Sequence, residues 1–175
     1  MIIDTIPTPS SGRIGMTHAP GRSGPDALGR IWQRSLDADL SAIEAQGVGL
    51  MVSLIEQDEF ARLGMPELPQ KVALRQFRWQ HFPIVNMGIP VSQPAGRLRR
   101  LLDEVENVLG KGENVLFHCA AGLGRTGTMV ALVLIDRFNM SPRQAIDAVR
   151  AVRPGTIESE DQIRFLLDAR PGGAR

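Results

Sequence analysis

Hydrophobic and polar positions along this chain switch repeatedly between a helical period and short apolar runs. Leu36, Leu40 and Ile43 lie on one helical face of a segment that ends at Gly47. Directly after it, residues 48–55 form an apolar run that is typical of a buried strand. The same patterns predict strands at 77–85 and 114–119 and helices at 94–112, 141–155 and 156–170. A further helix is expected to begin in the loop before 124 and to run to about 138. Within 57–76 we expect one or two short helices, broken at Pro66 and Pro69.

Helices that alternate with strands predict an α/β fold with a central, mostly parallel sheet flanked by helices. The run at 114–119 is apolar throughout, so we expect it near the centre of that sheet. Residues 1–30 are rich in Gly, Pro and Ser and are expected to be an irregular segment that packs on the domain, with a short strand near 14–16. The main domain is expected to span 31–170, and residues 171–175 are expected to form a frayed tail.

Composition narrows the class of protein further. A chain of 175 residues buries about 70% of its extended surface on folding, which is enough for one core of sheet and helices. Its net charge is +1, so neither nucleic acid nor a membrane surface is an expected partner. The first residues lack a signal-peptide pattern, and the longest apolar run, 129–135, is too short to span a bilayer. A single cysteine excludes an internal disulfide and a cysteine-rich zinc site, and we expect a monomer in the reducing cytoplasm.

Residues 118–128, HCAAGLGRTGT, carry the candidate chemistry. The only cysteine, Cys119, is followed six positions later by Arg125, with Gly122 and Gly124 between them. Inward-facing N–H groups of a glycine-rich turn bind anions, and the start of the next helix adds further N–H groups. Arg125 adds a planar fork for two phosphate oxygens, and this positive setting favours a Cys119 thiolate placed to attack phosphorus. Taken alone, a cysteine at the end of an apolar strand would be a buried small hydrophobe.

The full loop pattern is His-Cys, two variable residues, Gly, two variable residues, Arg, then Thr and Gly. It resembles the cysteine-dependent protein tyrosine phosphatases, in particular the compact dual-specificity group, and AGLGRTG is most similar to the cell-cycle and cyclin-dependent-kinase-associated phosphatases. Residues 81–90, HFPIVNMGIP, are similar to the general-acid loop of that family, and 153–166 to the segment that follows its catalytic helices. The resemblance covers most of 35–168 and implies a protein tyrosine phosphatase-like fold.

The resemblance also implies a role for each matching residue. Cys119 would attack the phosphate and form a cysteinyl-phosphate, and Thr126 would assist the breakdown of that intermediate. His118 would orient the loop, and Gln162 would position the hydrolytic water, as a glutamine does in some relatives, unless it is an exposed polar residue of the last helix. The residues expected to bind phosphate are Ala120, Ala121, Gly122, Leu123, Gly124 and Arg125. This chemistry needs no metal and no organic cofactor.

The chain departs from the family at the residue that donates a proton to the leaving oxygen. Relatives have an aspartate there, whereas HFPIVN places Asn86 at this position. An amide has no titratable proton to give. Because general acid catalysis is typically worth about 10²–10⁴-fold, this substitution bears directly on activity.

Four explanations for Asn86 are open at the level of sequence. Another carboxylate could donate the proton, and the candidates are Glu56, Asp58, Glu59 and Asp161, each of which is otherwise an ordinary solvated charge. The substrate could carry a leaving group that needs no acid. The domain could be a phosphate-recognising interaction module with impaired catalysis. Finally, Asn86 could be an introduced change that slows the reaction.

The expected substrates are proteins that carry phosphotyrosine, phosphoserine or phosphothreonine, or a small phosphate monoester. Phosphoinositide phosphatases of this superfamily tend to place lysines at the variable loop positions, which here are the uncharged Ala120, Ala121 and Leu123. A highly anionic inositol substrate is therefore disfavoured. Rhodaneses and arsenate reductases fit less well, because the former lack the His-Cys and Thr-Gly pattern and the latter need further cysteines.

Overall fold

The computed structural model describes residues 1–26, 29–90, 94 and 96–173. Its main sheet has five strands in the order β1-β2-β7-β5-β6. These strands are β1 Asp4–Pro7, β2 Arg13–Thr17, β5 Val48–Ser53, β6 Arg78–His81 and β7 Asn114–His118. Within this sheet, as far as the structure describes it, only β1 and β2 pair in antiparallel fashion, and the other neighbouring strands are parallel. The prediction of a mostly parallel sheet is therefore confirmed, with the apolar run at 114–118 as its central strand.

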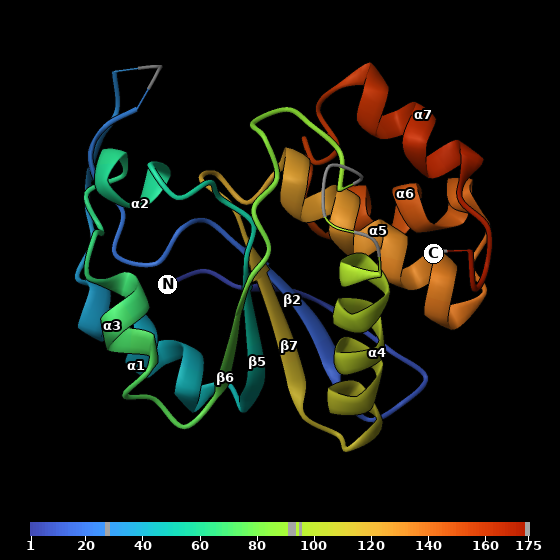
Figure 1. Cartoon of the computed structure of the whole chain (residues 1–175), viewed down its shortest axis with the longest axis horizontal. Helices are drawn as coiled ribbons and strands as arrows, with labels where there is room; N and C mark the ends of the chain where they lie inside the picture. The colour runs from blue at the N-terminus through green and yellow to red at the C-terminus, as the bar shows by residue number, and fades with distance from the viewer. Residues whose placement is uncertain (27–28, 91–93, 95, 174–175) are drawn as a thin grey trace.

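Helices cover both faces of this sheet. They are α1 Leu36–Ala45, α2 Glu59–Arg62, α3 Leu68–Val72, α4 Arg97–Gly110, α5 Gly124–Phe138, α6 Pro142–Val152 and α7 Glu160–Asp168. Figure 1 shows α1 and α3 on one side of the sheet and α4 to α7 on the other. Residues 124–136 of α5 are all buried, because this helix lies between the sheet and the outer helices. Within the part of the chain described, no helix is both long enough and apolar enough to cross a membrane.

The N-terminal segment is more regular than the sequence indicates. Both β1 and β2 belong to the main sheet, and β3 Ser23–Pro25 and β4 Ile31–Gln33 form a separate hairpin. The strand expected near 14–16 is the middle of β2. Gly15 obscures it in the sequence, yet a Cβ there would lie 2.9 Å from side-chain atoms of both Ile3 and Leu116. Close packing between strands therefore requires a residue that has low strand propensity.

Two other expectations fall partly outside the described residues. The frayed tail expected at 171–175 includes 174–175, which are not described, while the Gly172 N–H donates to the Asp136 carbonyl oxygen at 3.2 Å. The helix expected at 94–112 includes Ala95, which is also not described, and α4 itself begins at Arg97. The division of the chain into 1–30, 31–170 and 171–175 stays a prediction.

Candidate active site

The loop that carries Cys119 connects β7 to α5 at the carboxyl edge of the sheet, where parallel α/β folds bind their ligands. Cys119 is buried at the end of the central strand. The backbone bends through residues 120–123, and α5 begins at Gly124. The first N–H groups of α5 have no acceptor inside the helix, so their hydrogen-bond partners must come from outside it.

Arginine side chains from distant segments hold the carbonyl groups of this loop. The Ala120 oxygen accepts from Arg22 Nη1 at 3.1 Å, and from the backbone N–H of Ala19 at 3.2 Å. Arg153 donates from Nη2 to the Ala121 oxygen at 2.9 Å and from Nε to the Gly122 oxygen at 2.6 Å. Because C=O and N–H point in opposite directions across a trans peptide, carbonyls held in this way turn the next N–H groups toward the loop interior.

Gly122 is required by both conformation and space. Its φ is +72°, a left-handed conformation that glycine adopts without steric cost. A Cβ at this position would overlap the Thr17 carbonyl oxygen of β2. The tight packing of the loop against β2 therefore depends on the absence of a side chain.

Arg125 follows this loop in the first turn of α5 and forms a buried ion pair with Glu59. Its Nη1 and Nη2 donate to Glu59 Oε2 and Oε1 at 2.5 and 3.0 Å, and the side chains are 2% and 3% exposed. Burial alone would lower the pKa of Arg125, but the hydrogen bonds that it donates to the Glu59 carboxylate outweigh burial, and the pKa is raised. Burial alone would raise the pKa of Glu59, but Arg125 and the Glu56 N–H lower it overall. An ionised Glu59 held in this way has no proton to give, which argues against it as the missing acid.

His118 is a buried, neutral residue beneath the loop. Burial lowers its pKa to about 4. Trp79 Nε1 donates to Ser53 Oγ at 2.8 Å, so the single hydroxyl proton of Ser53 is available for His118 Nε2 at 2.6 Å. His118 Nδ1 then carries the ring proton and donates to the Cys119 carbonyl oxygen at 3.2 Å. This chain of contacts fixes the backbone at the base of the loop.

Two predicted residues are placed differently from the simplest expectation. Thr126 Oγ1, which the resemblance expects to assist breakdown of the cysteinyl-phosphate, is fully buried and has no hydrogen-bond partner among the described residues, the Cys119 sulfur included. Gln162 is buried rather than exposed: its Oε1 accepts from the N–H groups of Glu158 and Ser159 at 2.9 and 3.3 Å. Its Nε2 donates to the Gly88 carbonyl oxygen at 3.1 Å. Gln162 thus joins the start of α7 to the segment that carries Asn86.

The segment 82–90 lies against Arg125 and α7, yet Asn86 itself is exposed. The Ile84 carbonyl oxygen accepts from Arg125 Nη1 at 3.1 Å, and the Met87 oxygen accepts from Ser159 Oγ at 3.0 Å. The structure therefore brings the position of Asn86 to the edge of the candidate site.

The remaining candidate acids have other surroundings. The Asp58 and Asp161 side chains are 74% and 75% exposed and pair with arginines of their own helices, Arg62 and Arg164. Glu56 is half-buried. As for metals, no cluster of three or more metal-ligating side chains occurs in the described ranges.

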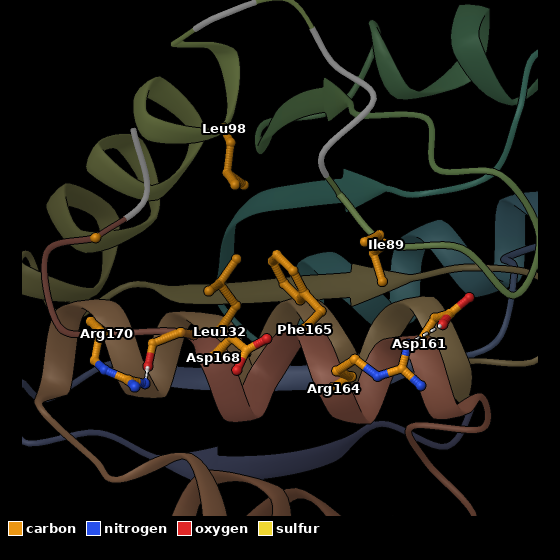
Figure 2. Close-up of a pocket in the computed structure, with 10 residues that line it drawn as sticks. Ile89, Leu98, Leu132, Asp161, Arg164, Phe165, Asp168 and Arg170 are labelled. Carbon is orange, nitrogen blue, oxygen red and sulfur yellow. Dashed lines mark hydrogen bonds and ion pairs between the residues drawn. The ribbon is translucent and has the colours of Figure 1, made fainter.

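A pocket of about 540 Å³ lies beside this site rather than in it. Figure 2 shows Ile89 and Leu98 facing Leu132 and Phe165 across an apolar interior. Charged side chains of α7 and the following turn lie around it, among them Asp161, Arg164, Asp168 and Arg170. The pocket shares the segment around Ile89 with the site but includes no residue of the Cys119 loop.

Comparison with known proteins assigns the fold and the loop to a family. Residues 41–171 match the family model described as dual specificity phosphatase, catalytic domain. The chain belongs to this family. It is 26% identical to cyclin-dependent kinase inhibitor 3 of Mus musculus over 158 residues, which cover 90% of this chain and 71% of that protein. It is 39% identical to the human dual specificity protein phosphatase CDC14C over 70 residues, covering 40% of this chain and 15% of that protein.

Solved dual-specificity and tyrosine phosphatases share the fold. The structure of kinase associated phosphatase matches with a TM-score of 0.82 at 22% identity, covering 95% of this chain and 92% of that chain. The active form of the phosphatase Tk-PTP matches with a TM-score of 0.66 at 24% identity, covering 90% and 92%. This dual-specificity phosphatase domain is therefore a cysteine-dependent protein phosphatase, and the alternative of an interaction module with impaired catalysis is not favoured.

Three residues of this phosphatase site are not identified by the sequence motifs. Arg22 lies in the glycine- and proline-rich N-terminal segment, where nothing in the sequence indicates a contact with the loop. Arg153 and Glu158 lie in the third segment that resembles the family, RPGTIESEDQ. The resemblance therefore points to this segment, but it does not indicate that either side chain contacts the loop. Glu158 is the carboxylate that touches the loop: its Oε2 accepts from the Gly124 N–H at 2.7 Å.

Proposed function

We propose that this protein phosphatase hydrolyses phosphate monoesters of phosphotyrosine and of phosphoserine or phosphothreonine proteins through a cysteinyl-phosphate at Cys119. In the first step the Cys119 thiolate forms the S–P bond while the bond from phosphorus to the leaving oxygen breaks. In the second step water attacks phosphorus, the S–P bond breaks, and inorganic phosphate and the thiolate are released. Arg125 and the amides of 120–125 hold the phosphate oxygens in both steps.

The observation that carries this proposal is the set of hydrogen bonds from arginine side chains to the carbonyl oxygens of the loop. Arg22 and Arg153 bind the carbonyls of 120–122 from outside, which leaves the N–H groups for an anion. Support also comes from kinase associated phosphatase, whose structure carries a serine in place of its catalytic-site cysteine. Cys119 occupies the only position in this chain that offers such a thiol.

A phosphoprotein substrate fits this loop better than a phosphoinositide. Ala120, Ala121 and Leu123 bring no extra positive charge for further phosphates. The related CDC14C is named as a protein phosphatase. A thiolate nucleophile survives in a reducing compartment, so we place the activity in the cytoplasm. We also take the chain to act as a monomer.

The test is release of inorganic phosphate from phosphotyrosine and phosphothreonine peptides, with a phosphoinositide as comparison substrate. The parent chain should act on the peptides, and Cys119→Ser should release no phosphate while keeping its fold. Turnover that persists in Cys119→Ser would rule out the covalent route. A preference for the phosphoinositide would overturn the assignment of substrate class.

A further inference from the structure

A carboxylate of the protein already accepts a hydrogen bond from one of the backbone N–H groups that are expected to bind the phosphate. The Glu158 side chain reaches the start of α5, where its Oε2 accepts from the Gly124 N–H at 2.7 Å. A Cβ on Gly124 would lie 2.6 Å from this oxygen, so the glycine leaves the space that the carboxylate fills. The Glu158 carboxylate thus binds the loop at a position where a phosphate oxygen of the substrate is expected to bind.

The backbone under Glu158 is firmly held, although its side chain is exposed. Arg150 donates from Nη2 and Nε to the carbonyl oxygens of Ile157 and Thr156 at 2.9 and 3.1 Å. Ile157 is buried at a φ of +60°, which is a rare conformation for a β-branched residue and marks a segment under local strain. The Glu158 N–H donates to Gln162 Oε1 at 2.9 Å. Because the backbone is fixed and the side chain is exposed, the carboxylate can leave the Gly124 N–H by rotamer changes alone.

The site lacks a proton donor at the expected position. Asn86 carries no titratable proton, and Glu59 is committed to Arg125 by two hydrogen bonds. The sequence candidates Asp58 and Asp161 pair with arginines on their own helices. Among the described residues, the Glu158 carboxylate accepts a hydrogen bond from a backbone N–H of the loop itself, at Gly124, an amide expected to bind the phosphate.

We propose that Glu158 is the general acid of this phosphatase, in place of the aspartate that Asn86 replaces. The proposal rests on the proposed function of Cys119. A bound phosphate takes the Gly124 N–H and displaces the Glu158 carboxyl from this amide. As the bond to the leaving oxygen breaks, the Glu158 carboxyl gives its proton to that oxygen. The resulting carboxylate then takes a proton from the water that attacks the cysteinyl-phosphate.

Leaving-group dependence tests this role directly, because a poor leaving group needs the proton and a good one does not. Glu158→Gln should lower kcat on phenyl phosphate by about 10²–10⁴-fold and on dinitrophenyl phosphate by about tenfold or less. Glu160→Gln, an exposed carboxylate two residues further on, is the matched control and should behave as the parent on both substrates. If the ratio of kcat on dinitrophenyl phosphate to kcat on phenyl phosphate is the same in Glu158→Gln as in the parent, the proposal is overturned.

Vanadate inhibition supplies a readout independent of turnover. Since Glu158 competes for the Gly124 N–H, Glu158→Gln should bind vanadate a few-fold more tightly than the parent, whereas weaker binding would contradict the contact. The two proposals fail in different ways. If the parent does not hydrolyse dinitrophenyl phosphate, or if Cys119→Ser does, the covalent mechanism fails. If both behave as expected and Glu158→Gln keeps the parent's leaving-group dependence, only the role of Glu158 fails.

Discussion

Two loops meet at Arg125, and they are built in different ways. The loop 119–124 is anchored on all sides: its carbonyls bind arginines from two distant segments, and His118 fixes its base. The segment 82–90 is anchored at Phe82 and Ile84 but exposes Val85, Asn86 and Met87 at its tip. Phosphate binding needs many groups at fixed positions, whereas proton donation needs one group within reach of the leaving oxygen. The second task is therefore open to a residue from another element.

The largest expected effect comes from the anchored loop. Arg125→Lys keeps the charge but loses the planar fork and its two hydrogen bonds to Glu59, so kcat/KM should fall by about 10²–10³-fold. Arg99→Lys makes the same exchange on the exposed face of α4 and should leave kcat/KM unchanged. Steady-state kinetics on a phosphotyrosine peptide measures both. Comparable activity in Arg125→Lys would mean that the fork is not what holds the phosphate.

Substitution of Glu59 tests whether its ion pair with Arg125 stabilises the fold as well as the site. Glu59→Gln leaves a buried guanidinium without its counter-charge, which should cost about 3–5 kcal/mol in the free energy of unfolding. Urea titration measures this loss, with Glu56→Gln as the neighbouring carboxylate control, for which a change below about 1 kcal/mol is expected. An equal effect of both variants would show that the pair with Arg125 has no special part in stability.

The contrast between the loops also explains what the sequence could predict. Cys119, Gly122 and Arg125 lie within a short contiguous motif between a strand and a helix, so local spacing revealed them. Arg22 is 98 residues from the Ala120 carbonyl that it binds, and Glu158 is 34 residues from Gly124. Such contacts depend on how the chain packs.

The same holds for the fold. A clear apolar period predicts the helices to within a few residues, whereas the sequence of β1 and β2 is largely typical of irregular chain. Their strand conformation comes from pairing with β7 rather than from local propensity.

His118 gives the anchored region a pH signature. Its pKa is about 4 in the folded chain and near 6.5 when unfolded, so the unfolded state binds more protons between these values. The free energy of unfolding should therefore fall as the pH drops through this window, by about 2 kcal/mol from pH 7 to pH 5. Urea titrations of the parent and His118→Gln over this range isolate the contribution. A parallel pH dependence in the two would show that His118 is not held neutral by burial. His18→Gln is measured alongside, because burial also lowers the pKa of His18 and its separate contribution must be subtracted.

The smallest effect is expected at the exposed tip of the other loop. If Glu158 supplies the proton, Asn86→Asp adds a second acid where one already works, so kcat on phenyl phosphate should change by about tenfold or less. In a Glu158→Gln background the same substitution should restore most of the lost rate, since the segment 82–90 already lies against Arg125. A rise of about a hundredfold or more in the parent background would mean that no other residue donates the proton. The phosphatase would then be a slowed form of its family, and the position of Asn86 alone would set its rate.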